Sequence, residues 1–426
     1  MKARLLTRVV AIGAVTALAA TGCANNSSEG GGGAAGSATK ELIVSTDLPL
    51  QGSSGSQSDS TNKMIQLYLD SIGGKAGNYT VKLKTYDDST AAKAAWDEAA
   101  CAKNATDHVA NENEVAVMGT LNSGCAKIIV PTLNRDPDGP MLMVSHANTN
   151  VGLTKKWETG EPEKFYPSGK RNYARVVTTD DYQGNAAAAF VSEKLKAKRC
   201  FVLNDNQTYG IGVGKSFAEA AKETGIEVVG EQAWDAKQPN YTALFQAVKA
   251  SKADCVYLAG IYDNNGGQLV KDKVAVLGKN TGDVKLMAPD GFTGYPDLQK
   301  LKEAEGMYLT FPGLATEELT KAGGVTTKLI ADYKAKHGAD PVGNYPLLGV
   351  AAMQVMLAAI EKSDGTRAGV TNAVFSGEGI TISKDKSVLG KEIKIDPASG
   401  DTTSKDITVE LLTGGKETFF QTQTVD

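Results

Sequence analysis

The stretch CFVLNDNQTYGIGVGKSFAEAA, residues 200–221, decides the fold of this chain. It begins with a short apolar run, which is typical of a buried strand. A polar loop with glycines follows, and after it the apolar residues recur at helical spacing. The stretch therefore predicts a strand at 200–204, a loop, and a helix at 211–224.

The glycines of this loop raise the question of whether it binds a nucleotide. A Walker loop, G-x-x-x-x-G-K-[ST], would need a glycine five residues before Gly214, where Tyr209 stands. The spacing G-x-G-x-x-G fails as well, because Lys215 or Phe217 occupies its third glycine position. We therefore expect the glycines to open a helix beside a cleft, with Tyr209 at the carboxyl end of the strand.

Strands and helices alternate on both sides of this stretch. Between residues 41 and 150, the runs ELIVSTDLP, EVAVMGTL and PMLMVSHAN are typical of strands, and helical patterns separate them. The alternation begins again near residue 173, which predicts two α/β arrays with parallel sheets and crossover helices. Helices at about 321–336 and 345–362 precede a hairpin in ITVELLTGGKETFF, so we expect the chain to cross between the arrays more than once.

Composition and charge narrow the function classes. The chain has 426 residues, of which 41% are hydrophobic and 22% charged, and this length favours two domains or more. The net charge of −4 comes without long charged runs, so nucleic acid is not an expected partner. The pairs Asp87–Asp88 and Asp180–Asp181 precede helices, where capping and loop hydrogen bonds account for them. We expect neither an enzyme nor a cofactor.

The N-terminus predicts export and a lipid anchor. Residues 1–22 have a basic start and the apolar core VVAIGAVTALAA, which is about the length of a signal-peptide core. They end in AATGC, which resembles a bacterial lipobox with Ala20 in place of the usual leucine, so we expect a lipid on Cys23. An ordinary signal peptide cut nearby is the alternative. Residues 23–40 would form a flexible tether, and the body would lie at the outer face of the cytoplasmic membrane.

Export changes the interpretation of the other cysteines. Four remain after Cys23, namely Cys101, Cys125, Cys200 and Cys255, and two disulfides are expected outside the cytoplasm. The first two lie in one helix and at the start of the next. The other two begin strands at the same register, so parallel neighbours would bring their sulfurs together. Four buried thiols are the alternative. No metal site is expected, because there is no C-x-x-C and the three histidines are scattered.

A set of motifs in a fixed order carries a family resemblance. LIVSTDLPLQGSSG, YDDST, GTLNSGCA, MVSHANTNVGLT, NDNQTYGIGVG and MAPDGFTG together resemble the substrate-binding proteins of ATP-driven amino-acid importers, in the leucine/isoleucine/valine-binding, type 1 periplasmic group. The resemblance implies two doubly wound, Rossmann-like α/β lobes joined by a three-crossover hinge. Lobe 1 would comprise residues 41–178 with about 313–400, and lobe 2 residues 179–312 with about 401–426.

The resemblance also implies a set of ligand contacts. A buried amino acid needs partners for both of its charges. The Ser123 hydroxyl and the backbone N–H and hydroxyl of Thr149 would hold the α-carboxylate. The Ala147 carbonyl would accept from the ammonium group, and Asp290 would pair with it where the family usually has glutamate. Among the aromatic residues, the expected cleft walls are Tyr209, Tyr345 and Tyr262, with Ile261 as the alternative to the last.

The function implied is capture of a small molecule by hinge closure and its delivery to an ABC permease. Branched-chain amino acids are the first expectation, and other amino acids, short amides, urea-like compounds or aromatic acids are alternatives. A monomer is expected. The same fold could serve a sensor, and an exported enzyme using Asp87 or Asp290 is a further alternative from a different class.

Overall fold

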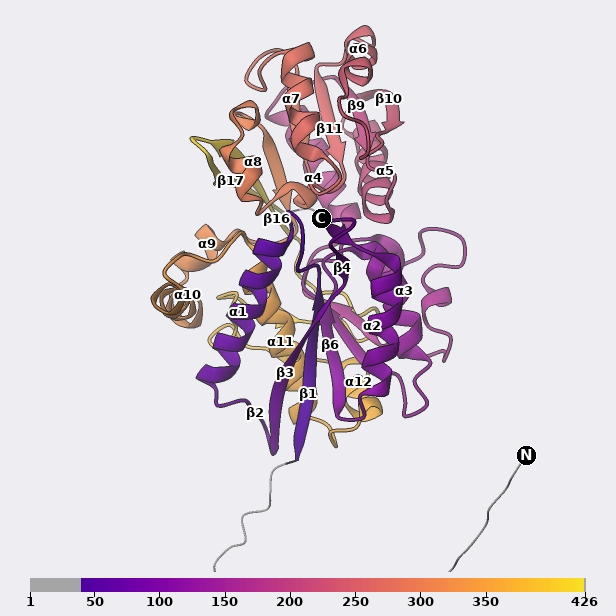
Figure 1. Cartoon of the computed structure of the whole chain (residues 1–426), viewed down its shortest axis with the longest axis vertical. Helices are drawn as coiled ribbons and strands as arrows, with labels where there is room; N and C mark the ends of the chain where they lie inside the picture. The colour runs from indigo at the N-terminus through magenta and orange to yellow at the C-terminus, as the bar shows by residue number, and fades with distance from the viewer. Residues whose placement is uncertain (1–39, 425–426) are drawn as a thin grey trace, which may run out of the picture. The chain divides into compact units, whose positions relative to one another are not determined.

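The computed structural model describes residues 40–424. The predicted signal peptide, Cys23 and almost all of the predicted tether therefore lie outside the described residues. Within the described part, the strands form two main sheets (Figure 1). Each sheet has buried cores of its own. The expected pair of α/β arrays is thus confirmed.

The first sheet has six strands in the order β2-β3-β1-β6-β7-β8. All of its pairs are parallel except the short β2–β3 pair. Its strands are β1 (Glu41–Leu48), β2 (Lys75–Ala76), β3 (Tyr79–Asp87), β6 (Glu114–Gly119), β7 (Leu142–Ser145) and β8 (Tyr173–Arg175).

Helices α1, α2, α3, α10, α11 and α12 pack with this sheet or with one another, and we call this body lobe 1. The apolar helix α11 is buried along nearly its whole length, which explains why its sequence shows no polar face. The bounds are α1 (Gly55–Ser71), α2 (Glu98–Ala110), α3 (Ser123–Asn134), α9 (Thr316–Lys321), α10 (Gly324–His337), α11 (Tyr345–Glu361) and α12 (Arg367–Phe375). Short pairs β4 (Ser89–Thr90) with β5 (Ala95–Trp96), and β14 (Thr381–Ile382) with β15 (Ile393–Lys394), complete it.

The second sheet has seven strands in the order β10-β9-β11-β12-β13-β16-β17 and belongs to what we call lobe 2. Its pairs are parallel up to β13, and the final hairpin adds two antiparallel strands. The strands are β9 (Arg199–Asn204), β10 (Glu227–Ala233), β11 (Cys255–Ala259), β12 (Lys285–Ala288), β13 (Tyr308–Phe311), β16 (Asp406–Thr413) and β17 (Lys416–Thr424). The helices are α4 (Asp180–Glu193), α5 (Thr208–Glu223), α6 (Thr242–Ala250), α7 (Gly266–Leu277) and α8 (Pro296–Lys300).

The deciding stretch folds as predicted, with one difference. Its strand is β9 and its helix is α5, but the helix begins at Thr208 rather than near 211. The three glycines therefore lie inside the first turns of the helix. An added Cβ at Gly210 would come within 2.1 Å of a carboxylate oxygen of Asp205, so a side chain there would not fit. Because glycine has no side chain, α5 can lie close to neighbouring segments at these positions.

The chain crosses between the two sheets three times: after β8, after β13 and before β16. This is the connectivity that the resemblance implied. Both disulfides are present as paired from the sequence, Cys101–Cys125 in lobe 1 and Cys200–Cys255 in lobe 2. The second joins residues that are direct partners in the parallel β9–β11 pair, which is the register expected.

Candidate functional site

A small cavity lies between the lobes, where the carboxyl ends of strands from both sheets come together. Such edges are where open α/β sheets bind ligands. The residues that line it come from both lobes and include polar, aromatic and aliphatic side chains. They are Gln57, Leu121, Asn122, Ser123, Ala147, Tyr209, Ile261, Asp290, Gly291, Tyr295 and Tyr345.

Asp290 is the centre of this cavity's chemistry. It follows β12 and is 4% exposed. Its carboxylate accepts hydrogen bonds from the Gln183 amide at 2.7 Å, the Tyr209 hydroxyl at 2.5 Å and the Tyr345 hydroxyl. Burial raises the pKa of Asp290, and these three donors partly lower it. All three donors are neutral, so within the described residues this buried carboxylate has no cation beside it.

The two tyrosines that bind Asp290 come from opposite lobes. Tyr209 lies in the first turn of α5, and its hydroxyl also accepts from the Gly291 N–H at 3.1 Å. Tyr345 is the first residue of α11 in lobe 1. Burial, and then the negative charge of Asp290, raise the pKa of both phenols, so they remain neutral donors. Asp290 thus links the two lobes through hydrogen bonds.

A second buried carboxylate, Asp180, corrects an expectation from the sequence. It begins α4 without acting as a cap, and its two oxygens have no hydrogen-bond partner of good geometry among the described residues. Burial, and next the charge of Asp290, raise the pKa of Asp180 well above its usual range. The nearby Thr149 side chain opposes this shift, yet its own hydroxyl oxygen also lacks a well-aligned partner. Only the neighbouring Asp181 forms the loop hydrogen bonds that were expected, with Thr179 and Lys155.

Several further polar atoms in the cavity wall or near it are buried and have no hydrogen-bond partner in the described part of the chain. An unsatisfied buried polar group costs about 1–3 kcal/mol, so natural proteins keep few of them. Their gathering here indicates a site that a ligand or water completes. They are Gln57 Oε1, Asn122 Oδ1, His146 Nδ1, Gln183 Oε1 and Tyr257 OH. Burial lowers the pKa of His146 to about 3, so this imidazole is neutral and brings no positive charge.

The lobe 1 wall offers donors rather than charges. Ser123 is the first residue of α3, and its hydroxyl oxygen accepts from the Asn150 N–H at 3.4 Å, which leaves its proton free for another acceptor. A helix N-terminus with a hydroxyl at its first residue suits an anion. Ala147 lies in the wall, and Thr149 is buried beside it.

One expected cleft residue lies elsewhere. Ile261 lines the cavity, and Tyr262 does not. The Tyr262 ring packs on Tyr295, with ring centres 4.8 Å apart, and on Phe292. Adjacent residues of the turn after β11 point to different sides, so Ile261, the alternative from the sequence, takes the place given to Tyr262.

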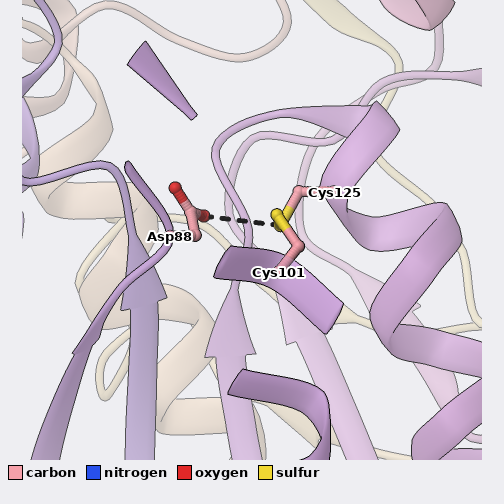
Figure 2. A group of neighbouring side chains, drawn as sticks. All are labelled: Asp88, Cys101 and Cys125. Atoms are coloured by element: carbon pink, nitrogen blue, oxygen red, sulfur yellow. Dashed lines mark hydrogen bonds between the residues drawn. A yellow bond between two sulfur atoms is a disulfide. The ribbon is translucent and has the colours of Figure 1, made fainter. Parts of the chain in front are cut away.

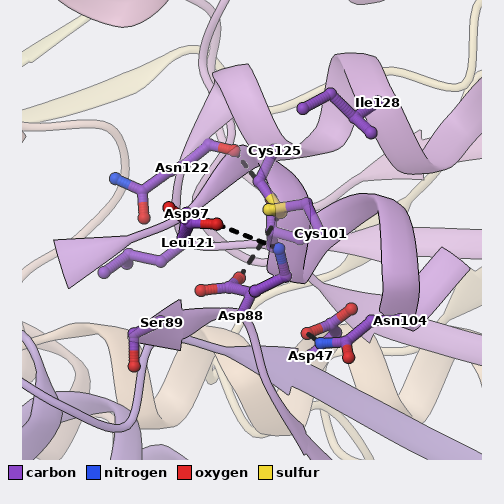
Figure 3. The surroundings of a disulfide bond; sticks show 12 residues. Asp47, Asp88, Ser89, Asp97, Cys101, Asn104, Leu121, Asn122, Cys125 and Ile128 are labelled. Carbon is purple, nitrogen blue, oxygen red and sulfur yellow. Dashed lines mark hydrogen bonds between the residues drawn. A yellow bond between two sulfur atoms is a disulfide. The ribbon is translucent and has the colours of Figure 1, made fainter. Parts of the chain in front are cut away.

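The Cys101–Cys125 disulfide lies directly behind the lobe 1 wall. Cys125 is in the first turn of α3, two residues after Ser123. The buried Asp88 carboxyl lies 3.6 Å from its sulfur (Figure 2), and Asn122 of the cavity wall lies next to it (Figure 3). Burial, followed by the charges of Asp47 and Asp87, raises the pKa of Asp88 well above its usual range. Since both sulfurs are joined to one another, this trio offers a metal ion only the Asp88 carboxyl.

Known proteins are similar to this chain in sequence and in fold. The family model described as periplasmic binding protein matches residues 48–403. A Leu/Ile/Val-binding protein of Rhizobium johnstonii is 25% identical over 387 residues, which cover 89% of this chain and 94% of that protein.

Two solved structures illustrate the range of the fold. A leucine-binding protein of Thermotoga maritima superposes with a TM-score of 0.73 at 22% identity, over 90% of this chain and 99% of that one. A solute-binding protein of Rhodopseudomonas palustris in complex with p-hydroxybenzoic acid also gives 0.73, at 18% identity, over 90% of this chain and 97% of that one. At these identities the structures show the fold alone.

None of the helices within residues 40–424 is both long and apolar enough to cross a membrane. The two facing lobes, the cavity at the strand ends and the family match over residues 48–403 agree with the order of motifs in the sequence. The chain therefore belongs to the periplasmic binding proteins of type 1, a family of extracytoplasmic solute-binding proteins.

Proposed function

We propose that this protein captures a free amino acid and delivers it to the permease of an ATP-driven importer. Branched-chain amino acids are the first candidates for the ligand. The observation that carries the proposal is the Asp290 carboxylate, which is buried between the lobes with three neutral donors and, within residues 40–424, no cation. A ligand with an ammonium group would supply the missing positive charge. Asp180, buried near it, would add negative charge only if a bound ammonium group lowers the raised pKa of this carboxyl.

The other end of the ligand would face lobe 1. The Ser123 hydroxyl, the N-terminus of α3 and Thr149 would bind the α-carboxylate, and the Ala147 carbonyl would accept from the ammonium group. Leu121 and Ile261 supply apolar surface for a branched side chain. A zwitterion would thus find opposite partners on the two sides of the cavity.

An aromatic acid such as the hydroxybenzoate bound by the Rhodopseudomonas palustris protein fits this chain less well. It would bring a second negative charge close to Asp290 and no cation. Like charges in a buried site repel strongly, because little water screens them. The charge of the cavity therefore favours an amino acid.

Hinge closure would complete the site. In this proposal, lobe 1 comprises residues 41–178 with about 313–400, and lobe 2 residues 179–312 with about 401–426. Opening would separate Tyr345 from Asp290 and admit the ligand, and closing would exclude water. A micromolar affinity, about −8 kcal/mol, would suit a protein that must also release its ligand.

The sequence adds an anchor to this proposal. A lipid on Cys23 and the glycine-rich tether that follows would hold a monomer at the outer face of the membrane, within reach of the permease. Intact mass measurement of the protein from membranes tests this part, with the diacylglycerol mass expected and an unmodified N-terminus contradicting it.

The ligand itself is best identified directly. Native mass spectrometry of the purified protein should release a bound amino acid intact, and a thermal-shift panel of the twenty amino acids should raise the melting temperature by mass action. Leucine, isoleucine or valine should give the largest shift. The absence of a shift with every amino acid would defeat the assignment while leaving the fold unchanged.

A further inference from the structure

Asp263 joins the lobes at a point outside the ligand cavity. It lies in lobe 2 after β11, and its carboxylate faces Ser54, which directly precedes α1 in lobe 1. The Ser54 N–H donates to Asp263 Oδ1 at 3.0 Å, and the Ser54 hydroxyl donates to Oδ2 at 2.5 Å. Asp263 does not line the cavity.

The contact with Asp263 supplies a hydrogen-bond acceptor at the N-terminal end of α1. The first N–H groups of a helix have no acceptor within the helix and need a cap. Ser54 stands at the N-cap position of α1, but its side chain makes no capping hydrogen bond to the helix, and no acidic residue lies in the first turn. The Asp263 carboxylate of the other lobe instead accepts from the N-terminal end of α1, where the helix dipole favours a negative charge.

Tyr295 connects this contact to the ligand cavity. Its hydroxyl lies 3.1 Å from the Ser54 hydroxyl and donates to Asp263 Oδ2 at 2.9 Å, and Tyr295 itself lines the cavity. Gln57, in the first turn of α1, lines the cavity as well. The contact and the candidate ligand site are therefore adjacent parts of one interface between the lobes.

The contact exists only when the lobes meet. Ser54 and Tyr295 are each 2% exposed, and Asp263 has no cationic partner among the described residues. When the lobes separate, water replaces these partners and the end of α1 loses its acceptor. The two hydrogen bonds from Ser54 to Asp263 therefore favour the closed state.

We propose that Asp263 is a positioning residue that latches the closed state by capping α1 across the cleft, and so sets how long the ligand is retained without touching it. This inference rests on the proposed function for its ligand, but not for the closure itself. Losing one cap is expected to speed ligand release about five- to tenfold, because a cap contributes about 1 kcal/mol. Association should change less than twofold.

The test compares Asp263→Asn with wild-type protein in two measurements. Stopped-flow binding of L-leucine should show faster dissociation in the variant. Fluorescence energy transfer between dyes on one exposed residue of each lobe should show a smaller closed fraction, with and without leucine. Ser54→Ala should shift both quantities in the same direction by less, because its backbone N–H remains, whereas Asp283→Asn, a change at an exposed aspartate of lobe 2, should shift neither.

The outcomes separate the two proposals. A protein that closes in the dye experiment but does not bind leucine would contradict leucine as ligand and leave the latch standing. Equal closed fractions and equal dissociation rates in wild-type and Asp263→Asn would overturn the latch. A wild-type protein that never shows the short distance between the lobes would overturn it too.

Discussion

Two groups of buried carboxylates in this molecule differ in their partners. The carboxylates of the first group contact a cationic side chain, and those of the second group do not. In lobe 1, Asp47 and Glu114 both contact His108, at 3.1 and 2.5 Å, and all three side chains are 0% exposed. These carboxylates raise the pKa of His108 to about 9 against the opposing effect of burial, so the imidazole is positively charged. At the cavity, Asp290 has no such partner among the described residues.

The difference separates a structural network from a binding site. Uncompensated charges in a protein interior cost several kcal/mol, and the network around His108 is complete within the chain. Around His108, even the remaining oxygens are satisfied, by Ser45, Tyr86 and Asn104. Around Asp290, neutral donors occupy the oxygens and the charge itself stays unbalanced. A positive charge from outside the chain would complete it.

The largest expected effect is on binding. Asp290→Asn removes the charge that would attract the ammonium group but keeps the shape of the side chain. Leucine affinity, measured by isothermal titration calorimetry, should fall by about two to three orders of magnitude, or about 3–4 kcal/mol. The melting temperature without ligand should stay the same or rise, because an unbalanced buried charge is gone. If the variant binds leucine within fivefold of the wild-type affinity, the Asp290 charge does not serve ligand binding, and the contrast with the carboxylates around His108 fails.

The reciprocal substitution should affect stability instead. His108→Gln leaves Asp47 and Glu114 buried without a cation and should lower the free energy of unfolding by about 3 kcal/mol. Well below the melting temperature, leucine affinity should remain within twofold of wild type. Chemical denaturation and calorimetry measure the two quantities, with His337→Gln, on a partly exposed histidine, as control. A large loss of affinity with unchanged stability would contradict the assignment.

The pH dependence of stability should sharpen this contrast. The pKa of His108 is raised from 6.5 to about 9 by folding, so its contribution is fully present below pH 6.5 and is lost as the pH rises through 9. The difference in melting temperature between wild type and His108→Gln should therefore shrink between pH 7 and 9.5. A difference that is constant over this range would mean that His108 is uncharged in the folded protein.

The smallest expected effect is a difference in leucine affinity between variants that lack one or the other disulfide. Cys101–Cys125 holds the first turn of α3, which carries Ser123, whereas Cys200–Cys255 joins the starts of two strands. Replacing either pair by serines should lower stability by about 3 kcal/mol. Only loss of the first pair should also weaken leucine binding, by about threefold, in calorimetric titrations at a temperature where both variants are folded. An equal effect of both pairs on affinity would exclude a positioning role for the first.

Much of this architecture could be predicted from the sequence because local patterns determine it. A short apolar run identified β9, the helical spacing of apolar residues identified α5, and the matching starts of two strands identified the Cys200–Cys255 pair. The motifs directed attention to Ser123, Ala147 and Asp290, which the structure brings to one cavity. These residues follow strands, so the topology of the sheets alone places them at the same edges.

What the sequence could not supply depends on how distant segments meet. Asp180 matched the pattern of a helix cap, and only the packing of Thr149 and Asp290 against it reveals an unpaired buried acid. Whether Ile261 or Tyr262 faces the cavity depends on the backbone path of the turn after β11. The contact of Ser54 with Asp263 requires the two lobes to be placed against each other, and no local pattern encodes that placement.

In the proposed function, the positive charge that balances Asp290 is carried by the ligand. The most direct measurement compares, by calorimetric titration of the wild-type protein, L-leucine with 4-methylpentanoate, which is leucine without its amino group. We predict that leucine binds with micromolar affinity and that its analogue binds at least about 100-fold more weakly. Binding of 4-methylpentanoate within threefold of leucine would contradict the claim.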